Sequence, residues 1–378
     1  MEKRMSNKDR LTIGVLFGGR SGEHEVSLLS ARSVLSVLSA EKYTVIQIGI
    51  THTGSWLTGE DVLEKFEAGD TVGLLPAILL PEPGDNWLYT LHNQDGKQVM
   101  EPMAHLDVIF PVLHGTFGED GTMQGLLELA DIAYVGAGVL GSAVGMDKGL
   151  FKELMRSQQI PVLDSIVVNR AQIEQHPDAV LQAAEKLSAY PLFVKPANLG
   201  SSVGITKCRS RGDLTEGLLE AAQFDRRVLI ERGLNNPREI EISVLGNNTP
   251  QVSVPGEIVP RADFYTYRAK YLDDSSELII PAALPTETTA KIQALALQAY
   301  QTCDCSGMAR VDFLVDRESG EIFLGEINTI PGFTHISMYP KLWEASGISY
   351  SALVDRLVEL ALERKADRDH TERELSRA

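Results

Sequence analysis

The chain has 378 residues, of which 43% are apolar and 23% are charged, and its formal net charge is −17. This length allows two or three domains with substantial cores, and the composition is that of an ordinary globular protein. The acidic charge disfavours a nucleic-acid partner, which needs a basic stripe, and no apolar run approaches the roughly 20 residues of a membrane span.

The first predicted element is a buried β-strand over Thr12–Phe17, which explains the N-terminal sequence better than a signal peptide, because no cleavage pattern follows it. A glycine-rich turn, a helix and a second strand over Tyr43–Thr51 come next, as in a doubly wound α/β domain. The glycines are not spaced as G-x-G-x-x-G, which disfavours a dinucleotide site. Glu23 lies in the turn, where it either complements the helix dipole or holds a ligand's ammonium group.

Another buried strand is predicted over Leu106–Gly115, and His114 lies at its carboxyl end. Ligand sites of α/β proteins lie at such ends, although a lone histidine is often structural, so both interpretations stay open. A helix, a short strand and a long helix that carries Lys148 follow, before Pro161 opens a different region.

A smaller α/β unit is predicted from about Pro161 to Pro237, and its central feature is FVKPANLGSSVGI. Lys195 ends a strand, and the loop over 200–204 then offers successive backbone N–H groups, as loops that fold over phosphates do. The chain holds no P-loop motif, and a plain hairpin loop is the alternative. A lysine beside such a loop in an acidic protein favours phosphate contact. Glu231 and Glu239 lie on either side of the linker that follows.

The third region begins with strands in REIEISVLG, QVSVPGEIVP and ELIIPAAL. The polar and aromatic loop over Asp263–Ser276 is too long for a simple turn and is predicted to be a lid. An amphipathic helix leads from there to a β-hairpin, and a helix over Ser351–Arg364 precedes a charged tail, which we expect to be frayed.

The hairpin is formed by ARVDFLV and EIFLGEIN, and side chains alternate between the two faces of its strands. The odd-numbered apolar residues share one face: Val311, Phe313, Val315, Phe323 and Ile327. The even-numbered polar residues share the other face, at the open end: Arg310, Asp312, Glu326 and Asn328. Oxygen ligands of this kind suit Mg²⁺, and a solvated polar face is the alternative. The clustering of four polar groups favours the metal site.

The chain has three cysteines, and two of them, Cys303 and Cys305, are separated by a single residue. This pattern gives no disulfide framework and, without further cysteines or histidines at ligand spacing, no zinc motif. We therefore expect buried thiols in a reducing compartment, the cytoplasm.

Several motifs then occur together in one order: GGRSGEHEVSL, LHGTFGEDGTMQG, MDKGLFK, FVKPANLGSSVGI, RAKY, ARVDF and EINTIPGFTHISM. From about Thr12 to Leu360 the chain resembles the D-alanine–D-alanine ligase family of the ATP-grasp superfamily. The resemblance implies an α/β (α+β) fold with a doubly wound α/β domain over 1–140, a central ATP-grasp subdomain over 141–236 and a C-terminal ATP-grasp domain over 237–378. It also implies ATP, two Mg²⁺ ions that Mn²⁺ can replace, and a cytoplasmic homodimer. The reaction would join two D-alanines through D-alanyl phosphate, for peptidoglycan precursor synthesis.

The same resemblance implies roles for the residues in these motifs. The nucleotide would contact Lys148, Lys195, Gly200, Ser202, Glu231 and Glu239. Three residues would hold Mg²⁺, namely Asp312, Glu326 and Asn328. The catalytic group would comprise Glu23, Ser201, Tyr271, Arg310 and Gly332, and the D-alanines would also contact His114, Lys270, Ser337 and Met338.

Within these groups, Glu23 would receive the ammonium of the first D-alanine, while Ser201 and Tyr271 lock the surrounding loops. Arg310 and the Gly332 amide would stabilise an oxyanion.

Three alternatives remain. A D-alanine–D-lactate or D-alanine–D-serine ligase would differ in its lid residues and pH behaviour. Another ATP-grasp enzyme, such as a biotin-carboxylase-like one, would leave the HEVSL and THISM segments without a purpose. A non-catalytic nucleotide-binding module would not require all four polar residues of the hairpin.

Overall fold

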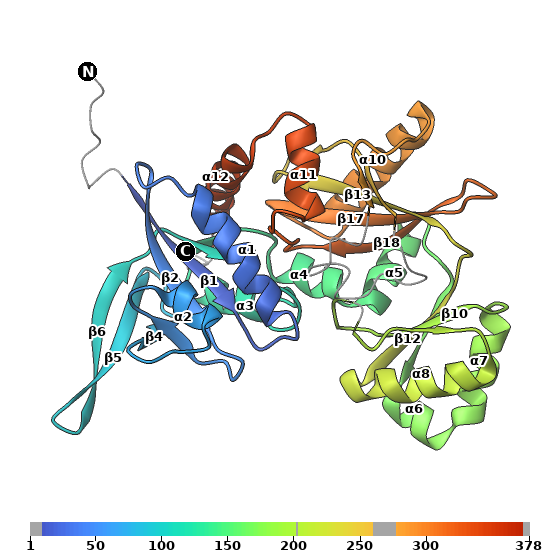
Figure 1. Cartoon of the computed structure of the whole chain (residues 1–378), viewed down its shortest axis with the longest axis horizontal. Helices are drawn as coiled ribbons and strands as arrows, with labels where there is room; N and C mark the ends of the chain where they lie inside the picture. The colour runs from blue at the N-terminus through green and yellow to red at the C-terminus, as the bar shows by residue number, and fades with distance from the viewer. Residues whose placement is uncertain (1–9, 202, 260–276, 373–378) are drawn as a thin grey trace, which may run out of the picture.

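Three β-sheets, formed by successive parts of the chain, organise the fold, as the computed structural model in Figure 1 shows. The structure describes residues 10–201, 203–259 and 277–372. No helix within these ranges is long and apolar enough to cross a membrane.

The first sheet has eight strands in the order β6-β5-β4-β3-β2-β1-β7-β8. Its strands are β1 (Leu11–Gly18), β2 (Tyr43–Ile50), β3 (Trp56–Thr58), β4 (Leu75–Leu79), β5 (Trp87–Gln94), β6 (Lys97–His105), β7 (Val108–Pro111) and β8 (Ala133–Tyr134). Strands β2, β1, β7 and β8 pair in parallel, which confirms the doubly wound prediction, and β3–β6 extend the sheet in antiparallel fashion. Its helices are α1 (His24–Val37), α2 (Val62–Glu67) and α3 (Thr122–Leu129).

The second sheet is antiparallel and has the order β11-β10-β12-β9. Its elements are β9 (Ser165–Asn169), α6 (Arg170–Gln175), α7 (Pro177–Leu187), β10 (Leu192–Pro196), β11 (Thr206–Cys208), α8 (Arg211–Phe224) and β12 (Arg227–Arg232). The segment between β9 and β10 forms two helices instead of one, because Pro177 starts α7 at the N1 position that proline favours.

The third sheet has the order β16-β15-β13-β17-β18, with β14 paired to β13. Its strands are β13 (Arg238–Leu245), β14 (Gln251–Val252), β15 (Gly256–Val259), β16 (Glu277–Ile279), β17 (Met308–Val315) and β18 (Ile322–Asn328). The remaining helices are α4 (Val139–Met146), α5 (Lys148–Ser157), α10 (Thr286–Thr302), α11 (Met338–Ala345) and α12 (Tyr350–Asp369). Phe151 and Met155 of α5 lie in the same buried cluster as Ile240 and Val311 of this sheet.

The break between α4 and α5 falls at Asp147, inside a stretch whose sequence predicts one continuous helix. The backbone of Asp147 is extended, and its carboxylate accepts a hydrogen bond of 2.9 Å from the Leu150 N–H. An aspartate in this N-cap position stabilises a new helix start. Lys148 therefore lies at the first position of α5.

Helix α12 is longer than predicted, so the expectation of a frayed tail is wrong for Lys365–Asp369. Arg368 donates to Asp131 at 2.7 Å and pairs with Glu128, and Lys365 lies 3.3 Å from Asp131. These ion pairs fix the last turns of α12 to the first domain, a partner that the local sequence does not reveal.

The predicted hairpin is formed by β17 and β18, with Asp312 opposite Glu326 at the site end. Beyond this pair the register shifts by one residue at Gly325. Such a bulge reverses which side chains face the core. The placement of Phe323 on the apolar face is therefore wrong: Ile322 and Leu324 are buried instead.

Candidate active site

Two neighbouring pockets lie between the sheets. The larger is a cavity of about 690 Å³ between the second and third sheets, and Lys195, Glu231 and Glu239 are among its lining residues. Glu23, His114 and Gly200 line the smaller pocket. The two pockets share four lining residues: Lys148, Arg310, Glu326 and Gly332. A ligand in the larger pocket therefore lies next to one in the smaller.

The polar face of the hairpin lies where the pockets join. Arg310 donates to both carboxylate oxygens of Asp312, at 2.8 and 2.7 Å, and Asn328 donates to Asp312 at 3.0 Å. The Lys148 ammonium lies 3.9 Å from the Glu326 carboxylate. Asp312, Glu326 and Asn328 are only half-buried, so their oxygen atoms are accessible from the cavity. This donor set of two carboxylates and an amide fits Mg²⁺.

A third carboxylate, which the motif analysis missed, also contacts Arg310. Glu241 on β13 is buried, and its Oε2 lies 3.0 Å from the Arg310 Nε. Glu241 could have been suspected from its spacing, since it follows Glu239 by two residues in a strand and shares its face. Arg310 is thus held between two carboxylates, which fixes its guanidinium beside Gly332.

In the wall of the larger pocket, one buried carboxylate pairs with two lysines. Lys195 on β10 donates to Glu231 Oε2 at 2.5 Å, and Lys152 on α5 pairs with Glu231 Oε1. Lys152 and Glu231 are each 2% exposed. Sequence reasoning missed Lys152, although it lies four residues after Lys148, on the same face of α5.

The two ammonium groups keep this carboxylate ionised. Burial alone raises the pKa of a carboxyl group, but Lys152 and Lys195 outweigh it and lower the pKa of Glu231 to about 2. The group therefore consists of two cations and one anion, and its surplus positive charge lies in the wall of the larger pocket.

In the smaller pocket, Ser201 from the glycine-rich loop donates a hydrogen bond to the Glu23 carboxylate. Gly115 and Gly200 also lie against this carboxylate. A Cβ atom at Gly200 would come within 2.7 Å of Glu23 Oε2, and one at Gly115 would come closer still. Only glycine allows these loops to approach so closely, so three separate segments of the chain meet at Glu23.

His114 is buried, and both of its ring nitrogens have protein partners. Its Nδ1 lies 3.0 Å from the Ile330 carbonyl oxygen and its Nε2 lies 2.9 Å from the Ser30 hydroxyl. Burial lowers the pKa of His114 to about 4, so the ring is neutral at physiological pH. This arrangement suits a residue that positions the loop after β18.

Glu119 lies next to His114 and was also missed by the sequence analysis. Its carboxylate accepts hydrogen bonds from the backbone N–H groups of Gly115 at 2.8 Å and Ile330 at 3.0 Å. Burial and the negative charge of Glu23 raise the pKa of Glu119 to about 8. Glu119 could have been identified from its position, because it lies five residues after His114 in the loop that follows β7.

The last part of the site is the start of α11. Ser337 precedes the first residue of α11, and its hydroxyl group accepts a hydrogen bond of 3.0 Å from the Thr334 N–H in the loop before the helix. The Met338 side chain is buried with Ile258 and Leu342, and Ser337 and Met338 both line the larger pocket. A helix N-terminus of this kind favours an anionic group.

Three of the predicted site residues, Ser202, Lys270 and Tyr271, lie outside the described residues, as does most of the predicted lid. The other fifteen line the two pockets.

Comparisons with known proteins cover nearly the whole chain. Residues 12–137 match the family model described as D-ala D-ala ligase N-terminus, and residues 154–359 match D-ala D-ala ligase C-terminus. The D-alanine–D-alanine ligase of Natranaerobius thermophilus is 47% identical, over 97% of this chain and 99% of that protein. The enzyme of the same name from Thermoanaerobacter sp. is 50% identical, over 94% and 97%.

Two solved structures show the same fold. The D-alanine–D-alanine ligase from Coxiella burnetii has a TM-score of 0.79 and 36% identity, covering 96% of each chain. The VanG D-Ala:D-Ser ligase from Enterococcus faecalis has a TM-score of 0.80 and 35% identity, covering 93% of this chain and 99% of that one.

Proposed function

The chain belongs to the D-alanine–D-alanine ligase family of the ATP-grasp fold, and from this we propose how its two joined pockets perform the reaction. The enzyme is an ATP-dependent ligase that joins two D-alanines to D-alanyl-D-alanine, a step of peptidoglycan synthesis. The observation that carries the proposal is the polar face of the hairpin, which lies at the junction of the two pockets.

ATP occupies the larger pocket, whose 690 Å³ falls in the range of nucleotide-sized ligand sites. Glu231 and Glu239 lie toward the adenosine end, as acceptors for the adenine amino group and the ribose hydroxyls. Lys148 and Lys195 face the phosphates, together with the backbone of Gly200; Ser202, the other loop residue assigned to the nucleotide, lies outside the described residues. Four negative charges on the nucleotide are attracted by the surplus positive charge of the lysine group.

Asp312, Glu326 and Asn328 would hold two Mg²⁺ ions, replaceable by Mn²⁺, because both ions prefer hard oxygen ligands. The bound ions would supply positive charge that neutralises the transferred phosphoryl group.

The first D-alanine lies in the smaller pocket with its ammonium at Glu23 and its carboxylate toward the γ-phosphate. The carboxylate oxygen attacks phosphorus, the bond to the β-phosphate oxygen breaks, and ADP leaves. The product, D-alanyl phosphate, hydrolyses in water, so the contact between Ser201 and Glu23 protects it by closing the loops over the pocket. The same role is proposed for Lys270 and Tyr271, which lie outside the described residues.

The second D-alanine binds with its carboxylate at Ser337 and Met338, near the N-terminus of α11. Its free amine attacks the acyl carbon, and the developing oxyanion accepts hydrogen bonds from Arg310 and the Gly332 N–H. Inorganic phosphate then leaves. His114 holds the loop after β18 in place for this step.

The enzyme works in the cytoplasm as a homodimer. Three free cysteines, all buried, support the reducing compartment. Exposed apolar side chains on neighbouring helices α3 and α4, at Leu129, Val139 and Leu140, support a surface that a second subunit covers. Sedimentation equilibrium tests the dimer: a monomer at micromolar concentration would contradict it.

The decisive test of the function is ADP release with single and paired amino acids. We expect rapid release with D-alanine alone, little with L-alanine, and no depsipeptide when D-lactate competes with D-alanine at neutral pH. Mass spectrometry of the products identifies the second substrate directly. A mixed product with D-serine or D-lactate as the main species would contradict the assignment.

Replacing Lys195 with Ala is expected to weaken nucleotide binding by at least about tenfold, since one charge-assisted contact to the phosphates is lost. D-Alanine binding should change little. Calorimetric titration with a non-hydrolysable ATP analogue measures the effect, and Lys186→Ala, on the exposed surface of α7, is the matched control. Unaltered affinity would show that Lys195 has only a structural role.

A further inference from the structure

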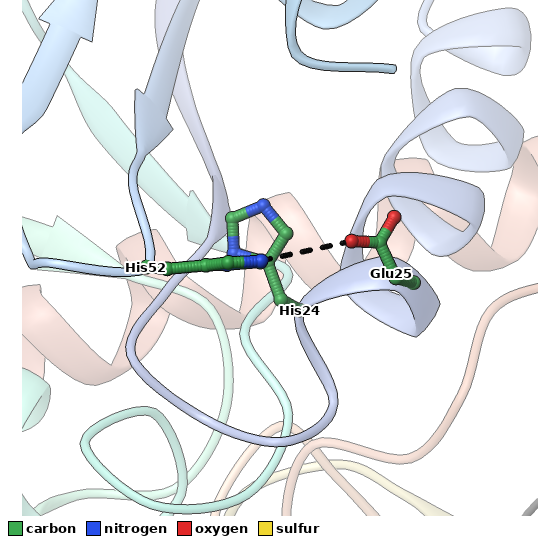
Figure 2. A group of neighbouring side chains, drawn as sticks. All are labelled: His24, Glu25 and His52. Carbon is green, nitrogen blue, oxygen red and sulfur yellow. Dashed lines mark ion pairs between the residues drawn. The ribbon is translucent and has the colours of Figure 1, made fainter. Parts of the chain in front are cut away.

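Two histidines and a glutamate lie together outside both pockets (Figure 2). His24 and Glu25 begin helix α1, and His52 lies in the loop that follows β2. One possible ligand atom of each residue lies within 4.8 Å of those of the other two. Among the described residues this is the one group of histidine, cysteine or acidic side chains with such spacing. It lies at the carboxyl ends of parallel strands β1 and β2, where ligand sites of α/β sheets are found.

His24 is the fixed member of the group. It is buried, and its Nδ1 lies 2.8 Å from the carbonyl oxygen of Gly19. Because a carbonyl oxygen only accepts hydrogen bonds, Nδ1 carries the proton and Nε2 keeps its lone pair. Burial lowers the pKa of His24, which keeps the ring neutral. Metal-binding histidines are oriented in this way, with the second nitrogen bonded to a carbonyl or carboxylate.

The other two side chains are free to adjust. The side chains of His52 and Glu25 are 63% and 67% exposed, and His52 Nε2 lies 3.8 Å from Glu25 Oε1. The ring centroids of His24 and His52 are 3.7 Å apart, with the ring planes nearly perpendicular. Zinc bonds of 2.0–2.1 Å in a tetrahedral site place ligand atoms about 3.3 Å apart. Because His24 is held in place, His52 and Glu25 must turn toward its Nε2 to reach this spacing, and both side chains are exposed.

We propose that His24, Glu25 and His52 bind a divalent transition-metal cation such as Zn²⁺, at a site separate from the magnesium site. Two imidazole nitrogens and one carboxylate favour Zn²⁺, Co²⁺ or Ni²⁺ over Mg²⁺, which prefers oxygen ligands alone. Three protein ligands leave the fourth position to water. Nothing in this proposal depends on the ligase reaction or on the roles of the pocket residues.

The site would connect two segments that flank the catalytic loop. Glu23 immediately precedes His24, so a cation that joins the start of α1 to the loop after β2 restrains the turn that carries Glu23. We expect micromolar binding and a measurable rise in Tm, because a cation that binds only the folded protein stabilises it.

The test uses tag-free protein in saturating Mg²⁺, so that the magnesium ligands are occupied. Zn²⁺ is titrated in competition with a fluorescent zinc indicator, and Co²⁺ is followed by its visible absorption, which is intense in tetrahedral sites. We expect the native protein to bind one equivalent and to gain thermal stability with Zn²⁺. His52→Ala and Glu25→Gln should each weaken binding by at least about tenfold.

His92→Ala is the matched control, because His92 also lies near a glutamate, 3.6 Å from Glu101, but in a different part of the first sheet. It should bind Zn²⁺ like the native protein. Less than one equivalent bound to the native protein at 100-fold molar excess of Zn²⁺ would refute the site. Unchanged affinity in both His52→Ala and Glu25→Gln would refute it equally, whatever the ligase activity of these proteins.

Discussion

Glu326→Gln is expected to lower the rate of ADP release with D-alanine by about a hundredfold, with the fold intact. A neutral amide keeps the shape of the side chain but removes one negative oxygen from the proposed magnesium site, and losses of a single electrostatic contact at a reacting phosphoryl or acyl group have this size. Glu326 is only half-buried and its carboxylate lies 3.9 Å from the Lys148 ammonium, and a partly exposed ion pair at this distance contributes little folding stability.

The measurement is the steady-state rate across a magnesium titration, with circular dichroism and Tm as checks of the fold. We expect the variant to need more Mg²⁺ and to stay slow when saturated. Glu318→Gln is the control, because this glutamate lies in the exposed turn of the same hairpin. If the variant matched native turnover at saturating Mg²⁺, Glu326 would not be a metal ligand.

Lys152→Met is expected to weaken ATP binding on the order of a hundredfold, although Lys152 does not face the phosphates. In the unliganded protein Glu231 pairs with both Lys152 and Lys195. When Lys195 turns to the nucleotide, Lys152 alone balances the buried carboxylate. Without it, binding would leave an unpaired buried charge, which costs about 3–5 kcal/mol, and 1.4 kcal/mol corresponds to a factor of ten.

The same pairing predicts that the Lys152→Met variant takes up a proton when it binds ATP. In the native protein Lys152 still pairs with Glu231 after binding and keeps the pKa of Glu231 low, so Glu231 takes up no proton on binding above pH 6. In Lys152→Met the loss of both ammonium groups lets burial raise the pKa of Glu231 in the bound state. Glu231 of the variant is therefore protonated when ATP binds, and the affinity of the variant for ATP rises as the pH falls.

Calorimetry at one pH in buffers of different ionisation enthalpy measures this uptake as the difference between variant and native protein. Lys152→Arg keeps the positive charge and should restore affinity without proton uptake. A purely structural role for Lys152 would lower Tm in Lys152→Met but leave the proton count unchanged, and that result would contradict the account.

Much of the site could be predicted from the sequence because strand parity is a local rule. Arg310, Asp312, Glu326 and Asn328 share one face since they lie two residues apart within each strand, close to the open end of the hairpin. The rule failed at Phe323 because a single bulge at Gly325 reverses which side chains of β18 face the core. No residue type marks such a bulge reliably in a sequence.

The residues that were missed are those whose partners lie far along the chain. Lys152 on α5 is important because it pairs with Glu231 on β12, and Glu241 on β13 is important because it pairs with Arg310 on β17. Glu119 is defined by its bond to the Ile330 N–H, which lies 211 residues away. Sequence motifs identify side chains that contact a ligand. Side chains that only position those residues can be identified once the folded structure shows their partners.

The position of α12 has a consequence for how the protein is made. Leu353 and Leu357 of this last helix share a buried cluster with Ile13 and Val108 of the first sheet. A ribosome synthesises the first sheet more than 200 residues before this helix, so the first sheet cannot complete its buried cluster until α12 has been made. We expect nascent chains that stop before Tyr350 to expose that apolar face and to be the species that chaperones retain.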